Sequence, residues 1–171
     1  GVVYPKPSLS MALSQNRTPD DLKEASANEK AAELEIGIKT KTKVMSINTK
    51  RQKVMTTTGG FTYQKLILAT GARALTPKVE GDAVHEMITI NDLAAYKKFY
   101  DKLQDKKDVT LIGGGLIATE LAEDLASYGV KVRMLVRGAH LMSQIMPEGI
   151  SSNLEDKLRA RGVDCLLYTS P

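Results

Sequence analysis

The clearest change of hydrophobic period in the chain lies between Val109 and Val136. A short apolar run, Val109–Ile112, meets three glycines and passes directly into a pattern in which apolar residues recur at helical spacing. Gly129 stands where such a helix ends, and Val130–Val136 predicts a second strand. The pattern therefore predicts strand, glycine turn, helix and strand within about 30 residues. The apolar helical positions are Leu116, Ile117, Leu121 and Leu125.

The glycines are spaced as GxGxxA, with Gly113, Gly115 and Ala118 at the three small positions. Gly113 permits a tight turn, and Gly115 has no Cβ to keep backbone away from a phosphate. Ala118 is small enough for the helix to pack against its strand. Free N–H groups at the start of a helix favour an anion there. Together these features predict a site for a dinucleotide pyrophosphate.

Three further helices are predicted. Thr18-Pro19-Asp20-Asp21 has a cap residue, a proline and acids at the start of a helix that extends to about Glu33. A second helix covers Asp92–Leu103, capped by Asn91 or Asp92. The third covers Pro147–Arg161 and stops at Gly162. On the first helix Leu22, Ala25 and Ala32 are expected to be buried, and on the second Tyr96, Phe99 and Tyr100 are expected in the core.

Between Leu34 and Ala69 the hydrophobic period is two, which predicts strands. Ile36–Ile38 begins the alternation, and a buried strand, Lys65–Ala72, ends it in a glycine turn. Lysines 39, 41 and 43 fall on one strand face, as a solvated face or as a docking patch for an acidic partner. The other strands are Val44–Ile47, Lys53–Thr57 and Phe61–Tyr63, the last two joined by a Thr58-Gly59-Gly60 hairpin. The C-terminal unit is expected to have only two parallel strands.

Composition narrows the class of protein. The 171 residues are 42% hydrophobic and 26% charged, as in an ordinary globular chain. No apolar run reaches the roughly 18 residues of a membrane span. The net charge of +4 is modest, and no five-residue basic block indicates nucleic acid as a partner. A single cysteine excludes an internal disulfide and any CxxC pair, so a cytoplasmic protein is expected. The opening Gly-Val-Val-Tyr predicts that the true start is missing.

Four segments of the chain resemble FAD-dependent pyridine-nucleotide reductases, most closely the bacterial rubredoxin–NAD reductase branch. They are Tyr4–Ser10, Leu66–Ala72, the pair Val79–Asp82 and Ile90–Leu93, and the glycine strand through Glu120. The resemblance implies an α/β flavoprotein with two dinucleotide-binding domains, present here incompletely. Residues 1–104 would be a partial FAD domain with a small antiparallel sheet and a linker, and residues 105–164 a truncated Rossmann-like NAD(P) domain. Residues 165–171 depart from the family and resemble a non-native tail.

The resemblance also implies roles for individual residues. Lys6 matches the lysine that reaches the flavin near N5, and Glu120 matches the glutamate that faces this lysine. Their charged ends are expected to meet within salt-bridge reach. Val44 matches the position whose backbone touches the adenine half of FAD, and Ala69-Thr70-Gly71 matches the segment that closes the FAD domain. Gly113, Gly115 and Ile117 would lie under the pyrophosphate of the nicotinamide nucleotide. No metal ligand and no side chain that itself reacts is implied.

Coenzyme choice and electron acceptor stay open. The acid expected to bind the adenosine ribose falls on Val136, which gives no support for NAD over NADP. Arg137 follows and is a candidate for the 2′-phosphate, whereas the nearest family branch uses NADH, which is therefore preferred. The resemblance implies electron transfer from NAD(P)H through FAD to rubredoxin. Ferredoxin reductases of oxygenase systems, the NADH-oxidising part of nitrite reductases, and a non-catalytic nucleotide-binding or redox-sensing module are the alternatives.

Overall fold

The computed structural model describes residues 1–168 and shows an α/β chain that divides into two compact units. The first unit contains residues 1–4 and 23–77. The second contains residues 5–22 together with the chain from residue 78 onward. The second unit is therefore built from two stretches of sequence that a long insertion separates. Within residues 1–168, no helix has the length and apolar character that crossing a bilayer requires.

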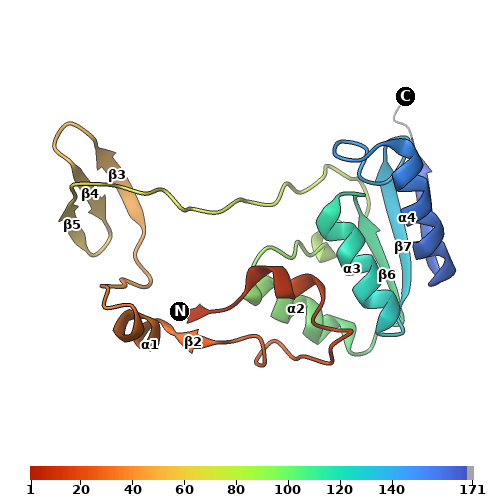
Figure 1. Ribbon diagram of the computed structural model, residues 1–171, viewed down its shortest axis with the longest axis horizontal. Helices are drawn as coiled ribbons and strands as arrows, with labels where there is room; N and C mark the ends of the chain where they lie inside the picture. The colour runs from red at the N-terminus through yellow and green to blue at the C-terminus, as the bar shows by residue number, and fades with distance from the viewer. Residues whose placement is uncertain (169–171) are drawn as a thin grey trace. The chain divides into compact units, whose positions relative to one another are not determined.

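A parallel three-stranded sheet forms the centre of the second unit (Figure 1). Its chain order is β6 (Asp108–Ile112), α3 (Leu116–Ser127), β7 (Lys131–Arg137), α4 (Glu148–Ala160) and β8 (Val163–Tyr168). Leu111 pairs with Met134 between β6 and β7, and Met134 pairs with Cys165 between β7 and β8. The predicted strand, glycine turn, helix and strand are confirmed. The expectation of only two parallel strands is wrong, because β8 adds a third.

Alternation along β7 determines which side chains enter this core. Val132, Met134 and Val136 are buried, whereas the residues between them are more exposed. Leu121 and Leu125 of α3 are buried at helical spacing. Leu116 and Ile117, in the first turn of the same helix, are instead 51% and 60% exposed. This turn lies beside the glycines, where the packed face of the helix has not yet begun.

The stretch Pro5–Leu22 packs with α2 and α3 to complete the second unit. It begins with a 3₁₀ turn, η1 (Lys6–Ser10), which contacts both α2 (Leu93–Leu103) and α3. The Asp92 side chain caps α2 by accepting from the Ala95 N–H at 2.8 Å, which confirms the predicted cap. Tyr96 and Phe99 are buried as expected, and Tyr100 is half-buried. A second short 3₁₀ turn, η2 (Val84–Glu86), precedes α2.

The first unit contains the predicted antiparallel sheet, formed by β3 (Val44–Asn48), β4 (Lys53–Thr56) and β5 (Gly59–Thr62). Thr56 pairs with Gly59, so Thr57 and Thr58 make the hairpin connection. The expected Thr58-Gly59-Gly60 connection is therefore wrong by one residue, since both glycines belong to β5. A separate two-stranded ladder joins β1 (Val2–Val3) to β2 (Ala25–Ser26).

The expected helix from Thr18 to Glu33 is mostly absent, and only its last part forms α1 (Ala27–Glu33). The Asp21 carboxylate accepts from the Thr18 N–H at 2.8 Å and from the Thr18 hydroxyl at 2.7 Å, which closes a turn. Ser26 and Glu29 then form a capping box, so the helix starts at Ala27. Leu22 is buried as expected, Ala25 is half-buried and Ala32 is exposed.

Two other expected strands do not form. Residues 36–43 contain no regular element, so lysines 39, 41 and 43 share no strand face. Lys65–Ala72, expected as a buried strand, is irregular and exposed, with Ile67 87% accessible. A strand needs a neighbouring edge for its N–H and C=O groups, and within residues 1–168 no strand pairs with this segment. An apolar sequence alone is therefore not enough to make this segment a strand.

The expected domain boundaries and the compact units follow different criteria. The boundary at residue 104 separates two predicted cofactor domains, whereas the structure groups residues 5–22 with the chain after residue 78. Cys165–Tyr168, expected to belong to a non-native tail, continues β8, and residues 169–171 lie outside the described part. Backbone pairing accepts almost any side chain, so the origin of this tail stays a prediction.

Candidate dinucleotide-binding site

The glycine turn lies where β6 ends and α3 begins. Gly113 has a φ of +125°, a conformation that strongly favours glycine, and its N–H donates to the Leu135 carbonyl at 2.9 Å. Gly115 is the N-cap of α3, with extended backbone and no side chain to cap the helix. The first N–H groups of α3 are therefore left for another acceptor, which is the arrangement that binds phosphate.

The space around each glycine separates a structural role from a binding role. A Cβ added to Gly113 or to Gly115 meets no described heavy atom within 4 Å, so both face open space. A Cβ on Gly114 would instead collide with Val136 Cγ1 and lie 3.2 Å from Leu141 Cδ2. Position 114 thus requires glycine, because the side chains of Val136 and Leu141 already fill the space that a Cβ would occupy. The open side at Gly113 and Gly115 fits a pyrophosphate group.

A loop after β7 holds this turn from beneath. The Met142 N–H donates to the Gly114 carbonyl at 2.7 Å, and the neighbouring Leu141 is fully buried. The buried Glu155 carboxylate of α4 accepts from the Leu141 N–H at 2.8 Å, and the Ser151 hydroxyl donates to the Leu141 carbonyl. Sequence reasoning missed Gly114 and this loop, because the second position of a GxGxxA pattern is unconstrained.

The end of β7 places the two residues expected near the ribose. Val136 is only 2% exposed, which explains why no carboxylate stands there: its side chain supports Gly114. Arg137 is the last residue of β7 and is exposed. Ile117 is exposed in the first turn of α3, beside the glycines. These positions agree with a nucleotide lying across the open face, and none of them distinguishes NADH from NADPH.

Lys6 and Glu120 both belong to the second unit, yet they do not form the expected ion pair. The Lys6 ammonium donates to Asn91 Oδ1 at 2.8 Å, immediately before the cap of α2. The Glu120 carboxylate, on α3, accepts from the Ser10 hydroxyl at 2.8 Å. Ser10 therefore links η1, which carries Lys6, to α3, which carries Glu120. An ammonium has three donors, of which Asn91 takes one, so the group retains donors for a ligand.

Sequence reasoning also missed Asp124. This residue lies one turn beyond Glu120 on α3 and is only 3% exposed. Its carboxylate accepts from the Leu13 N–H at 3.1 Å, from the Ser14 N–H at 2.8 Å and from the Ser14 hydroxyl at 2.5 Å. The spacing of four between two acids was the available signal, since it places both on one helix face. Nothing local indicated that their partners lie about 110 residues earlier.

The remaining expected FAD residues belong to the first unit. Val44 begins β3 and is 52% exposed. Ala69, Thr70 and Gly71 lie in the irregular stretch after β5, all exposed, and Gly71 has a φ of +68°. Taken alone, this unit leaves these residues at its surface and buries no large apolar side chain. The expected contacts of these residues with FAD therefore stay predictions.

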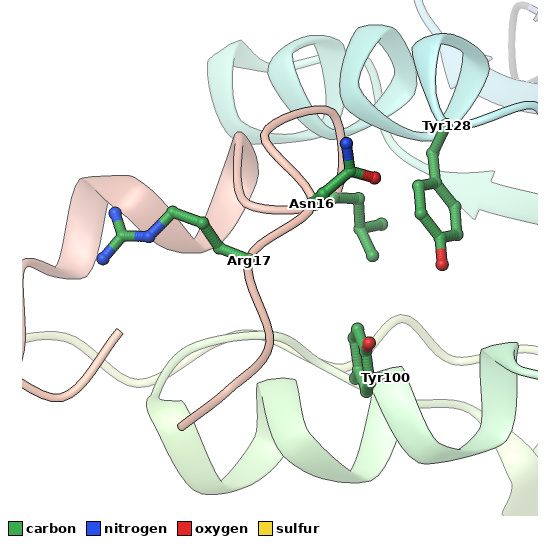
Figure 2. A pocket seen from close by; sticks show the side chains of 5 residues that line it. Asn16, Arg17, Tyr100 and Tyr128 are labelled. Carbon is green, nitrogen blue, oxygen red and sulfur yellow. The ribbon is translucent and has the colours of Figure 1, made fainter. Parts of the chain in front are cut away.

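A small pocket lies at the opposite end of α3 from the glycine turn (Figure 2). It has a volume of about 70 Å³ and is lined by Leu13, Asn16, Arg17, Tyr100 and Tyr128. Figure 2 shows the two tyrosines on either side of the space, whereas the Arg17 side chain extends away from it. Because α3 is 12 residues long, the pocket is about 18 Å from the glycines and is not the dinucleotide site.

Comparison with known proteins identifies relatives of the whole chain. The family described as "Pyridine nucleotide-disulphide oxidoreductase" matches residues 1–171. A rubredoxin-NAD(+) reductase of Alcanivorax borkumensis is 38% identical over 160 residues, which are 94% of this chain and 42% of the relative. A nitric oxide reductase FlRd-NAD(+) reductase of an Enterobacter species is 38% identical over 165 residues, 96% of this chain and 43% of the relative. The chain spans about four tenths of these curated relatives.

Solved structures show the same fold. A putidaredoxin reductase, solved in covalent complex with putidaredoxin, is 26% identical, with a TM-score of 0.83 over 98% of this chain and 41% of that chain. A ferredoxin reductase from Rhodopseudomonas palustris has a TM-score of 0.84 over 97% of this chain and 41% of that chain. Its identity of 24% supports the fold alone. Both matches agree with an α/β flavoprotein fold that is present here in part.

Proposed function

The chain belongs to the pyridine nucleotide-disulphide oxidoreductase family, and on this premise we propose that the protein passes electrons from NAD(P)H through FAD to a small electron-transfer protein. The observation that carries the proposal is the open glycine turn at the start of α3, with protein filling only the space below Gly114. Such a turn binds a dinucleotide pyrophosphate through backbone N–H groups. FAD would supply the hydride acceptor and release electrons to the partner.

The residues have separate tasks in this proposal. Gly113, Gly115 and the first turn of α3 hold the pyrophosphate, with Ile117 and Arg137 beside it. Lys6 orients the flavin edge and stabilises negative charge that develops on it, and Glu120 maintains the surroundings of that lysine. Val44 and Ala69-Thr70-Gly71 contribute backbone to the FAD site. The open space at the glycine turn supports the pyrophosphate role of Gly113 and Gly115. The hydrogen bond from Ser10 to Glu120 supports the proposal that Glu120 acts close to the turn that carries Lys6.

Rubredoxin is the proposed electron acceptor and NADH the proposed donor, in a cytoplasmic protein. Support comes from relatives at 38% identity whose names contain rubredoxin or FlRd together with NAD(+). Ferredoxin is the second candidate acceptor, favoured by the structural match to a reductase solved with putidaredoxin. A non-catalytic nucleotide-binding module is the alternative from a different class.

One experiment separates these possibilities. The protein that contains this chain is expected to purify with bound flavin, and NADH is expected to bleach its visible absorbance without oxygen. Rubredoxin and ferredoxin are then added separately, and the reduction of each is followed spectroscopically. NADPH in place of NADH measures coenzyme preference in the same assay. A colourless protein that does not take up FAD on reconstitution would eliminate the enzyme.

A further inference from the structure

Asp124 is a buried carboxylate whose hydrogen bonds all go to a distant part of the chain. It is 3% exposed and accepts from two backbone N–H groups and one hydroxyl, those of Leu13 and Ser14. Burial of a carboxylate is costly unless donors replace the lost water. These three donors therefore hold the Leu13-Ser14 backbone at one place on α3, about 13 Å along the helix from Gly115.

The segment that Asp124 holds is internally ordered back to Lys6. Within η1 the Ser8 N–H donates to the Pro5 carbonyl at 3.0 Å, and the Ser10 hydroxyl also contacts the Pro7 carbonyl at 3.1 Å. Pro5 and Pro7 each fix one backbone torsion, which leaves the turn few alternative shapes. A displacement at Ser14 is thus transmitted to Lys6 over a short, stiff stretch.

A second attachment joins the same segment to the same helix face. Ser10 donates to Glu120, which precedes Asp124 by one turn of α3. Glu120 is exposed and Asp124 is buried, so the two carboxylates differ in their surroundings. The buried one anchors the segment, and the exposed one lies nearer to the start of α3, where the nucleotide is proposed to bind.

We propose that Asp124 is a positioning residue, which sets the place of Lys6 relative to the glycine turn by fixing Leu13 and Ser14 on α3. The inference rests on the proposed function of this site. One helix then has two tasks: its N-terminus binds the nicotinamide nucleotide, and its next turns hold the loop that carries the flavin lysine. This arrangement keeps the hydride donor and the hydride acceptor in a constant relative position, because α3 positions both of them.

The test compares Asp124→Asn with Glu123→Gln in the flavin-loaded protein. Asn keeps the shape of Asp124 but loses its charge and one acceptor oxygen. Glu123 is the adjacent residue on α3, is exposed and pairs with Arg161, so its change leaves the Leu13-Ser14 attachment intact. Ser14→Ala is the milder variant, since it removes one of the three donors and retains both backbone bonds. It keeps the test decisive if Asp124→Asn does not fold.

Two readouts are expected to change together in Asp124→Asn. Hydrogen exchange at the Leu13 and Ser14 amides should become at least roughly tenfold faster. The rate of flavin reduction by NADH should fall roughly tenfold while the KM for NADH changes less than about twofold, because the lost interaction positions the flavin side. The visible spectrum of the bound flavin should shift, since Lys6 has moved. Ser14→Ala should show the same changes to a smaller extent, and Glu123→Gln none.

The outcomes separate this inference from the proposed function. Faster amide exchange with unchanged flavin spectrum and reduction rate would show that Asp124 is only structural and would overturn the positioning role. Unchanged amide exchange in Asp124→Asn, or equal effects in Glu123→Gln, would overturn the anchor itself. A wild-type protein without flavin overturns the proposed function and with it the positioning role. The amide readout then still decides whether Asp124 anchors the segment.

Discussion

At the scale of single residues, three consecutive glycines have three different reasons to be glycine. Gly113 needs its positive φ, Gly114 needs space above Val136, and Gly115 faces the open side of the turn. Only the first and third belong to the dinucleotide fingerprint. The structure therefore predicts that alanine at position 114 lowers stability, whereas alanine at position 115 weakens nucleotide binding.

Gly114→Ala should destabilise the second unit by about 1–3 kcal/mol, because the new methyl group collides with Val136. Gly115→Ala should leave stability within about 1 kcal/mol of the wild type, since its extended backbone suits alanine and its Cβ meets open space. It should nevertheless weaken NADH binding, because the methyl group occupies the proposed pyrophosphate position. Thermal unfolding and NADH titration measure the two effects.

The double variant Gly114→Ala with Val136→Ala is the control for this argument. Removing Cγ1 and Cγ2 of Val136 opens the space that the new methyl group needs, so the pair should lose less stability than the sum of the single changes. Additive losses would show that Gly114 is required for another reason. Equal loss of NADH affinity in both single variants would contradict the separation of roles.

Lys6→Met tests the other half of the site. We expect flavin reduction by NADH to slow roughly ten- to a hundredfold with NADH affinity nearly unchanged, because the lost interaction is mainly with reduced flavin. Glu120→Gln should be milder, since the amide oxygen still accepts from Ser10. Stopped-flow reduction measures both rates. Unchanged kinetics in Lys6→Met would end the assignment of this lysine to the flavin.

At the scale of elements, β8 shows how a strand forms where the sequence indicated a tail. Cys165 pairs with Met134 of β7 and is only 3% exposed. Burial raises the pKa of the Cys165 thiol, and the nearby Arg159 opposes this shift only in part. A thiol with a raised pKa has less of the reactive thiolate at a given pH.

We therefore expect Cys165 to react slowly with a disulfide reagent in the folded protein, at a rate that increases as pH rises toward the raised pKa. Denaturant should restore the rate of a free cysteine. The chain has one cysteine, so the released chromophore reports this residue alone. Immediate full reaction under native conditions would mean that β8 is not formed and that residues 165–168 behave as a tail.

At the scale of the whole molecule, the second unit is discontinuous in sequence. Pro5–Leu22 packs with α2 and α3, although residues 23–77 of the first unit separate this stretch from both helices in the sequence. Among the described residues, all of the buried apolar side chains belong to this discontinuous unit. They include Leu9, Leu13, Leu22, Tyr96, Leu125, Met134, Val136 and Leu141.

This arrangement predicts the result of limited proteolysis of the 171-residue chain. Trypsin should cut first in the exposed stretches without regular structure, which carry lysines 39, 41 and 43 and also Lys65, Arg73 and Lys78. The two products should stay together in gel filtration, because the buried contacts of Pro5–Leu22 do not depend on the cleaved link. Separation of the pieces without denaturant would contradict the discontinuous unit. Asp124→Asn should make that separation easier.

The sequence by itself determined the elements whose hydrophobic period is local. The β6–α3–β7 unit, helices α2 and α4 and the small antiparallel sheet were predictable because capping residues, glycines and side-chain period act within a few positions. The positions of Gly113 and Gly115 followed in the same way. Contacts inferred from the family resemblance were predicted less accurately. An ion pair was expected between Lys6 and Glu120, whereas Lys6 donates a hydrogen bond to Asn91.

Only the tertiary structure decided features whose partners lie far apart in the chain. In the sequence, Asp124 cannot be distinguished from an ordinary acid on a helix. Its hydrogen-bond donors, Leu13 and Ser14, lie about 110 residues earlier in the chain. Gly114 is explained only by Val136 below it, and Cys165 only by the free edge of β7. Lys65–Ala72 has the sequence of a strand and forms none, because a strand exists only where another edge accepts its hydrogen bonds. Local sequence sets the preference of a segment, and the available partner decides whether the preference is realised.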